Sequence, residues 1–379
     1  MPNAVRIALF VVLACDALMV VILIGLKTVH RARVRRHDRR REQYIQLLSR
    51  HLAFDHAVDP IPAQAGEDEA FLDAIIDLRN LVTGAEVRKL AVIANRYELI
   101  DRQSKRLRSR FPLSRRLRAA VSLAELGNEA SAATLMSHLD DPEPEIRIQA
   151  ARGLARIGHT PAIDPIVDRL EVEDAWVRAR FGDSLASFGS NASQPLMAYV
   201  RVNHQTGHTE AVVQALTTLG VIGDHGVGPQ LADVLAETTN PEIQIAIVDA
   251  LGWVGGSHVL DSVVGALHSP DWRVRAKAAT AIGMIGDSSA AHQLADALQD
   301  KAWWVRRNSA GALAMMRDGV ALLYWALTSS DAFARDAAAE ALEDIGELAK
   351  ARAAHASGDA SNDQLRLLRH MRSVSVVPA

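Results

Sequence analysis

The sequence predicts an all-α protein: a right-handed α-solenoid of about eight helical hairpins, preceded by a single transmembrane helix. Three observations support this prediction. A long apolar segment lies near the N-terminus, and a repeat of about 31 residues runs through roughly two thirds of the chain. Only 4% of the residues are aromatic although 49% are hydrophobic. That composition is typical of helical proteins rich in Ala and Leu, because β-strands favour aromatic and β-branched residues.

The charge is unevenly distributed along the 379 residues, whose formal net charge is −3. Residues 27–50 hold nine Lys or Arg against two acidic residues, and residues 96–118 also hold nine against two. Residues 119–379 hold 20 against 32. Since most of the chain is acidic, we expect no nucleic-acid partner. The single cysteine, Cys15, excludes an internal disulfide and a Cys-based zinc finger.

The segment 7–26 predicts a membrane anchor. Its 20 residues include one charged residue, Asp16, and about 20 apolar residues in a helix span the ~30 Å hydrocarbon core of a bilayer. A block of arginines follows the segment, whereas its N-terminal side has only Arg6. Because Lys and Arg collect on the cytoplasmic flank of a span, we expect a single-pass protein with its C-terminal solenoid in the cytoplasm.

Two alternatives for this segment stay open. The sequence VVLAC at 11–15 resembles a lipoprotein cleavage box, which would make the chain a periplasmic lipoprotein. The apolar run beyond Asp16 and the arginine block oppose that alternative. Asp16 lies near the middle of the span, where an ionisable side chain is costly. It either faces a polar group on a partner's helix or is tolerated in its protonated form.

A glycine that closes an apolar helical pattern marks the repeats. The closing positions are spaced by 31, 31, 34, 32, 31, 31 and 29 residues: Gly127, Gly158, Gly189, Gly223, Gly255, Gly286, Arg317 and Gly346. Leu or Ile lies four residues before each, and mostly a small residue lies seven before. This spacing predicts one buried helical face on which small residues allow a neighbouring helix to approach closely. The glycine is expected to end the helix in the left-handed conformation.

Each repeat is expected to contain two helices, because shorter apolar segments such as 262–268 and 293–299 precede the longer ones. Two helices in about 31 residues bury no core alone, so successive pairs must stack. The predicted organisation is an anchor at 1–26, a basic juxtamembrane segment and linker at 27–66, a helical cap or degenerate repeat at 67–95, the solenoid at 96–346 and a C-terminal tail at 347–379.

The segments EIRIQAARGLARIG (145–158), DWRVRAKAATAIGMIG (271–286) and FARDAAAEALEDIG (333–346) resemble the HEAT-repeat family. The similarity is to its short bacterial members, which are also seen in phycobilin-lyase-type repeats. The resemblance implies a general binding scaffold and does not indicate a particular reaction. Two repeats depart from the pattern, because Val212 and Gln244 stand where the others have Arg.

An arginine lies eleven residues before the closing position in six repeats. We call these residues the arginine column: Arg116, Arg147, Arg178, Arg275, Arg306 and Arg335. Asp141 and Asp300 lie six residues before Arg147 and Arg306. The family resemblance implies that such Asp–Arg pairs link successive repeats. We predict a structural role for the column, because a residue repeated in a repeated position usually belongs to the architecture.

Tryptophans lie close to this column. Four stand two or three residues before it, at the expected start of a second helix, and the fifth ends its helix: Trp176, Trp272, Trp303, Trp304 and Trp253. Trp beside Arg is the composition of a protein-binding hot spot, so we predict that these residues bind a partner. The alternative is that each indole fills the space between successive repeats.

A basic patch is predicted within 96–118. Its members are Arg102, Lys105, Arg106, Arg108 and Arg110. Such a patch suits lipid phosphate, nucleic acid or an acidic partner, and a first repeat that faces the membrane is the simplest interpretation. The alternative is a solvated basic face.

No catalytic residue, metal site or cofactor is predicted. His204 and His208 have the spacing of two ligands on one helix, but we expect both on the surface. The sequence has no HExxH, GxSxG, GxxxxGK[ST] or GxGxxG motif. The iron-binding HEAT hydroxylases build their sites from His-Glu dipeptides, and this sequence has none.

These observations predict a scaffold, not an enzyme: a membrane-anchored HEAT-repeat adaptor that binds a protein partner and no small-molecule substrate. The Ala- and Arg-rich composition suggests a bacterium, hence the inner membrane. By analogy with membrane-tethered bacterial repeat proteins, the partner is expected in an envelope complex, such as a polysaccharide glycosyltransferase. The alternatives are a HEAT-like lyase or ligand-binding enzyme, and a periplasmic lipoprotein scaffold.

Overall fold

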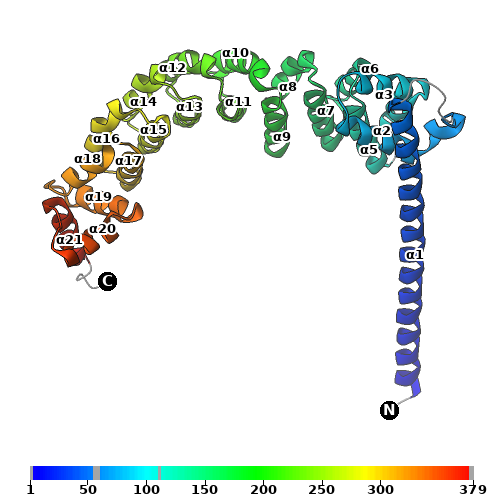
Figure 1. The fold of residues 1–379 in the computed structure, drawn as a ribbon, viewed down its shortest axis with the longest axis horizontal. Helices are drawn as coiled ribbons and strands as arrows, with labels where there is room; N and C mark the ends of the chain where they lie inside the picture. Colours follow the sequence, from blue (N-terminus) through cyan, green and yellow to red (C-terminus); the bar gives the residue numbers. More distant parts are fainter. Residues whose placement is uncertain (1–2, 54–59, 110–111, 375–379) are drawn as a thin grey trace. The chain divides into compact units, whose positions relative to one another are not determined.

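The computed structural model describes the backbone of residues 3–53, 60–109 and 112–374, and within these ranges the side chains from residue 16 to residue 372 except that of Ala17. Every regular element of this described part is an α-helix or a short 3₁₀-helix, which confirms the predicted all-α class. The chain divides into two compact units, residues 1–153 and 154–379. Figure 1 shows the course of the helices in each.

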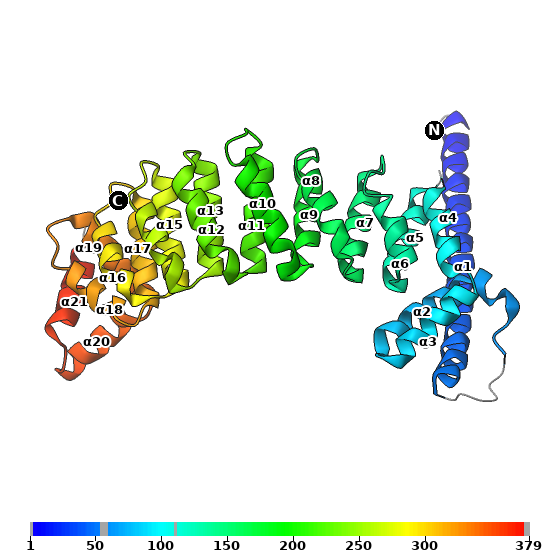
Figure 2. The ribbon, with the colours of Figure 1, turned by 90° about the horizontal axis from the view of Figure 1, so that it is seen from above.

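The first unit is built on one long helix. Its elements are α1 (Asn3–Ala53), α2 (Glu69–Leu81), α3 (Ala85–Arg96), α4 (Leu99–Arg108), α5 (Leu113–Leu126), α6 (Glu129–Met136) and the start of α7 (Pro144–Ile157). The C-terminal half of α1 packs on α2 (Figure 2). There the Phe71 ring lies between the rings of Tyr44 and Tyr97, at centroid distances of 5.1 Å each. Much of the expected juxtamembrane linker therefore continues α1 and belongs to this folded unit.

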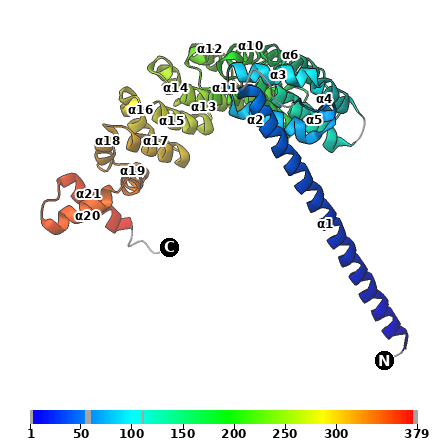
Figure 3. The ribbon, with the colours of Figure 1, turned by 45° about the vertical axis from the view of Figure 1, so that its right-hand side comes forward.

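The N-terminal part of α1 extends beyond the other helices of its unit (Figure 3). The large apolar side chains between Leu18 and Leu26 are 50–65% exposed, because no other helix of the unit covers them. In the part of the chain that the structure describes, no helix is both long and apolar enough to cross a bilayer. Of the predicted span 7–26, the side chains of residues 7–15 lie outside the described residues.

The second unit is a row of helical hairpins that follows the predicted repeat. Its helices are α8 (Ile163–Arg169), α9 (Ala175–Ala186), α10 (Ser193–Asn203), α11 (Thr209–Ile222), α12 (Gly228–Glu237), α13 (Pro241–Val254), α14 (Leu260–Ala266), α15 (Trp272–Ile285), α16 (Ala291–Ala297), α17 (Trp303–Met315), α18 (Gly319–Ala326), α19 (Ala332–Asp344), α20 (Glu347–Ser357) and α21 (Asn362–Val374). In this unit α12, α14, α16 and α18 form the outer layer of a curved row, and α13, α15, α17 and α19 form the inner layer (Figure 1).

The inner helices lie unusually close to one another. A Cβ atom added at Gly283 in α15 would lie 2.8 Å from the Cβ of Ala312 in α17, which is closer than carbon atoms can pack. The predicted small residues seven positions before the closing position, such as Ala279 and Ala310, are fully buried. Small side chains therefore set the spacing of the inner layer, as the sequence predicts.

Several closing glycines end their helices as predicted, but Gly255, which follows α13, has a ψ of −171° and is not in the left-handed conformation. Gly127, Gly223 and Gly286 follow α5, α11 and α15 in the left-handed conformation, where each backbone N–H bonds the carbonyl four residues before. Arg317 ends its repeat differently. Helix α17 stops at Met315 and the chain turns through an extended Met316, so no side chain has to adopt a positive φ there.

The expected C-terminal tail is folded as far as residue 374. Helices α20 and α21 form a further hairpin in which Leu348 and Leu367 are buried. Tyr324 of α18 donates a hydrogen bond of 2.9 Å to Glu347, and a 2.8 Å contact joins His370 to Asp336 of α19. This hairpin covers the apolar face that the last predicted repeat would otherwise leave open.

The closing glycines predict a clear response to alanine. We expect Gly286→Ala to lower the free energy of unfolding by about 1 kcal/mol or more, because its φ of 72° strains an L-residue. Gly265→Ala is the matched control: it lies inside α14 with no atom within 4 Å of its Cβ, so the stability should rise by up to about 1 kcal/mol. Urea unfolding followed by circular dichroism measures both. Equal effects of the two changes would contradict the assigned role.

Candidate protein-binding surface

The arginine column holds the turns between paired helices. The Arg306 side chain donates to the backbone carbonyls of Asp300 and Lys301 at 2.8 and 3.2 Å. Arg147, Arg275 and Arg335 make the same two bonds, to the carbonyls six and five residues before them. Each guanidinium thereby satisfies turn carbonyls that no helix can satisfy, which is what the predicted structural role requires.

Two aspartates connect column arginines of neighbouring repeats, and we call these Asp–Arg contacts the ladder. In the second unit, the Asp300 carboxylate accepts bonds of 2.7 and 2.9 Å from Arg275 of the preceding repeat, while its carbonyl accepts from Arg306. In the first unit, Asp141 likewise accepts from Arg116, and its carbonyl accepts from Arg147. The Asp–Arg pairs that the family resemblance implies are present, and each joins one repeat to the next.

Burial makes the Asp300–Arg275 contact a coupled pair. The desolvation of Asp300 disfavours its charged form, but bonds from Arg275 and from the Ala302 N–H outweigh this effect. The pKa of Asp300 is therefore below its ordinary value of 3.8. The pKa of Arg275 is raised, chiefly by its hydrogen bonds to Asp300. Both groups are thus charged in the folded protein at neutral pH.

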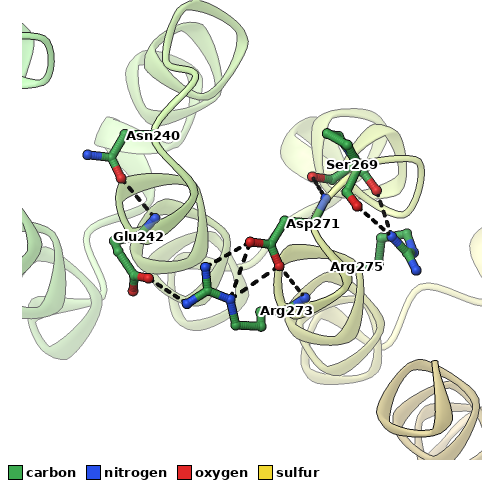
Figure 4. A network of polar contacts seen from close by, with 7 residues as sticks. Asn240, Glu242, Ser269, Asp271, Arg273 and Arg275 are labelled. Atoms are coloured by element: carbon green, nitrogen blue, oxygen red, sulfur yellow. Dashed lines mark hydrogen bonds and ion pairs between the residues drawn. The ribbon is translucent and has the colours of Figure 1, made fainter.

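A second polar network lies on the surface beside the ladder (Figure 4). Asp271 accepts a 2.8 Å bond from the Arg273 N–H and so caps α15. The Arg273 side chain binds Asp271 and reaches Glu242 of α13 at 2.5 Å. Hydrogen bonds from Arg273 hold the pKa of Asp271 below its ordinary value. This exposed network links α13 to α15, and the buried ladder links α15 to α17.

Aromatic side chains gather at the starts of the inner helices α15, α17 and α19. We call them the aromatic edge: Trp272, Trp303, Trp304 and Phe333. They are 43–63% exposed, so each side chain keeps a large part of its surface open to solvent. The rings of Trp303 and Trp304 meet edge to face at a centroid distance of 4.6 Å. Phe333 was not among the predicted residues.

A groove lies on the inner faces of the same three helices. It has a volume of about 400 Å³. Small residues such as Gly283, Gly311 and Ala337 line it. The lining also includes the apolar side chains of Met284, Met315 and Ile345 and the carboxylates of Glu340 and Asp344. Met side chains adapt to the shape of an apolar ligand. The groove is therefore suited to an extended or helical protein segment.

Arg307 connects the groove to the aromatic edge. Its guanidinium carbon lies 5.2 Å from the centroid of the Trp303 ring, and its Nη1 atom lies 2.5 Å from Glu340. Arg307 also lines the groove. The cation–π contact and the ion pair fix the orientation of the Trp303 ring relative to the groove. The edge and the groove thus form one continuous surface with aromatic, cationic and acidic groups.

The other predicted partner-binding residues lie elsewhere. Trp176 is at the start of α9, in the register of the aromatic edge, and it is 51% exposed. Trp253 lies at the opposite, C-terminal end of its helix, α13, so it does not belong to the edge. Trp325 of the outer helix α18 is 61% exposed and was not predicted.

The remaining predicted residues have these positions. Arg102, Lys105, Arg106 and Arg108 belong to α4, whereas Arg110 lies outside the described residues. The Asp16 side chain is exposed on α1. His204 is buried and contacts the Arg201 carbonyl at 3.0 Å, so its predicted surface position is wrong. In the described part of the chain, no three His, Cys, Asp or Glu side chains are placed to hold a metal ion.

The family model of HEAT repeats matches residues 100–186, 132–217, 204–277, 228–314 and 260–343, which together exceed half of the sequence. The chain belongs to the HEAT-repeat family. A crystal structure of a Kap121p mutant shares the fold with a TM-score of 0.51 and 13% identity over 89% of this chain and 44% of that one.

Two further HEAT-like structures are more distant in shape. Human deoxyhypusine hydroxylase in complex with glycerol has a TM-score of 0.29 and 20% identity over 66% of this chain and 96% of its own. The complex of CpcE and CpcF of phycocyanin lyase from Nostoc sp. PCC7120 has a TM-score of 0.30 and 22% identity over 65% and 94%. Comparison with the curated proteins finds no match.

The HEAT ladder predicts a pH-dependent loss of stability. We expect Asp300→Asn to lower the free energy of unfolding at pH 7 by about 1.5 to 3 kcal/mol, because Arg275 loses its charged partner. The folded pKa of Asp300 is depressed, so its contribution is present above pH 3.8 and is lost as the pH falls through that lower pKa. The difference between wild type and variant should therefore vanish in strong acid, and a constant difference down to pH 2 would contradict the assignment. Urea unfolding at pH 7, 4 and 2 measures it.

Proposed function

We propose that this HEAT-repeat protein is a membrane-anchored scaffold that binds a protein partner through the aromatic edge and the adjoining groove. The observation that carries the proposal is the exposure of four aromatic side chains next to a groove on the same helices. Aromatic residues beside arginine dominate the binding energy of protein interfaces. Singly exposed apolar residues are ordinary, but such a cluster beside a groove is typical of a recognition site.

The charge of the surface favours a particular kind of partner segment. Residues 119–379 carry 20 Lys or Arg against 32 acidic residues, and Glu340 and Asp344 line the groove. We expect the partner to present apolar side chains flanked by basic residues, since complementary charge increases the rate of association. No catalytic step is needed for this role, and we propose that the protein is not an enzyme.

The exposed apolar surface of α1 supports the anchor. Between Leu18 and Leu26 large apolar side chains point outward on all sides of the helix, and a helix that is apolar all round needs an apolar environment. The arginines that follow favour a cytoplasmic location for the repeats. We propose a bacterial inner-membrane protein whose partner belongs to an envelope complex.

The partner-binding proposal predicts a loss of capture without a loss of fold. The double variant Trp303→Ala and Trp304→Ala is expected to weaken partner capture about tenfold or more. Its melting temperature should change little, because both indoles are about half exposed. Affinity purification from detergent-solubilised membranes with quantitative mass spectrometry measures the capture. The matched control is Trp325→Ala, which removes a 61% exposed tryptophan from the outer layer and should leave capture unchanged.

A groove variant separates the two parts of this surface. The Cβ position of Gly311 has no atom within 4 Å, so Gly311→Leu is expected to fill the groove without disturbing the fold. It should reduce capture of the same protein that the double variant loses. A partner that is retained by both variants would bind elsewhere, and a double variant that unfolds would make the tryptophans structural.

The anchor predicts a defined topology. A reporter enzyme that is active only in the periplasm, fused at residue 360 in the turn between α20 and α21, should give no activity. The full chain should stay in the membrane pellet after an alkaline wash. Cys15→Ser is the control, because it abolishes anchoring only if Cys15 carries a lipid. An active reporter together with loss of anchoring in Cys15→Ser would replace this proposal by the lipoprotein alternative.

A further inference from the structure

A basic pocket lies in the first unit. The start of α2, the C-terminal half of α4 and the start of α5 enclose a volume of about 690 Å³. Four cationic side chains line it: Lys105, Arg106, Arg115 and Arg118. Only the first two belong to the basic patch that the sequence predicts, whereas Arg115 and Arg118 come from α5, which packs against α4. A pocket of this size suits a small ligand.

The charges in this pocket are not balanced by protein groups. Its one acidic lining residue, Glu69, lies 2.9 Å from Arg118 and 3.6 Å from Arg106. The side chains of Lys105 and Arg115 make no hydrogen bond or ion pair with any described residue. Four cations and one carboxylate leave three positive charges around one cavity. Such repulsion is relieved when an anion binds.

A buried donor also faces the pocket. The Gln103 side chain lines it, is only 3% exposed and has no hydrogen-bond partner among the described residues. Its amide can therefore donate to a ligand in the pocket. Ser114 lines the pocket from the first turn of α5, a 14-residue helix whose N-cap residue Pro112 provides no side-chain cap. The free N–H groups of a helix N-terminus favour an anion.

We propose that this pocket binds a phosphate group. Arg115 and Arg118 offer planar guanidinium groups that match the oxygens of a phosphate, and Lys105 adds a mobile ammonium. Gln103 supplies a fixed neutral donor. A basic face that is only solvated would not require such a donor, so its presence favours a binding site. The phosphate belongs either to the headgroup of an anionic lipid or to a free phosphate. The site lies in a different unit from the proposed partner surface and does not depend on it.

The test removes the two unpaired charges from the pocket. The double variant Lys105→Gln and Arg115→Gln, made in the full chain in neutral detergent, should bind inorganic phosphate at least tenfold more weakly, as measured by ³¹P NMR titration. The matched control is Arg88→Gln with Arg96→Gln, which removes two exposed positive charges from α3. The control should keep the wild-type affinity, because screened surface charges provide no defined site.

A second arm identifies the source of the phosphate. Native mass spectrometry of the full chain with added phosphatidylglycerol or phosphatidylcholine counts the bound lipids. If the pocket variant binds less phosphatidylglycerol than the wild type, the phosphate belongs to a lipid headgroup. If the wild type binds inorganic phosphate but retains no lipid, the ligand is a free phosphate. Arg115→Glu serves as a second variant and should abolish binding of whichever probe the wild type binds. Equal losses in the pocket and control variants, or no binding of either probe, would overturn the proposal.

Discussion

The structure depends on one constraint: no hairpin of this chain can bury its own apolar face. Ile282 and Leu313 are fully buried only because the inner helices that carry them lie side by side. This contact is so close that Gly283 faces Ala312 with no room for a further carbon. An indole cannot enter such a space. The six tryptophans accordingly all lie at helix ends or on the outer layer, 43–63% exposed.

The same constraint explains why the turns need arginines. The helices of these stacked hairpins are short, so many helix-terminal carbonyls lie along one edge of the row. A buried carbonyl without a hydrogen-bond donor lowers the stability of the fold. A long side chain from the next helix reaches back five or six residues and satisfies two of them at once, as Arg306 does. The length of the turn fixes the number of residues between these carbonyls and the arginine. The arginine therefore recurs at the same position of each repeat, and the sequence alone reveals this column.

Features that follow from the period could be predicted, and features that depend on lateral contacts could not. The glycine ends, the small residues of the inner layer and the arginine column all follow from spacing along the chain. Phe333 was not predicted, because the sequence pattern singles out tryptophans. The exposure of Phe333 depends on how α19 lies beside α17. In that contact the Arg306 guanidinium carbon lies 4.7 Å from the centroid of the Phe333 ring. The pocket of the first unit likewise depends on the packing of α4 against α5, which no periodicity specifies.

The two repeats without a column arginine show which part of the ladder is required. At Gln244 the side-chain amide donates 2.8 Å to the Thr238 carbonyl, six residues before it, so the turn bond persists without a charge. The link to the preceding repeat also persists in neutral form, since Asn240 donates 3.0 Å to Thr209 of α11. Val212, which is buried, keeps only apolar packing. The geometry of the turn is therefore the requirement, and the Asp–Arg ion pair is one way to meet it. A charged pair, once buried, is costly to break from one side. This explains why Asp300 and Arg275 occur together, whereas Arg178 and Arg335 belong to repeats that have the arginine but no aspartate six residues before it.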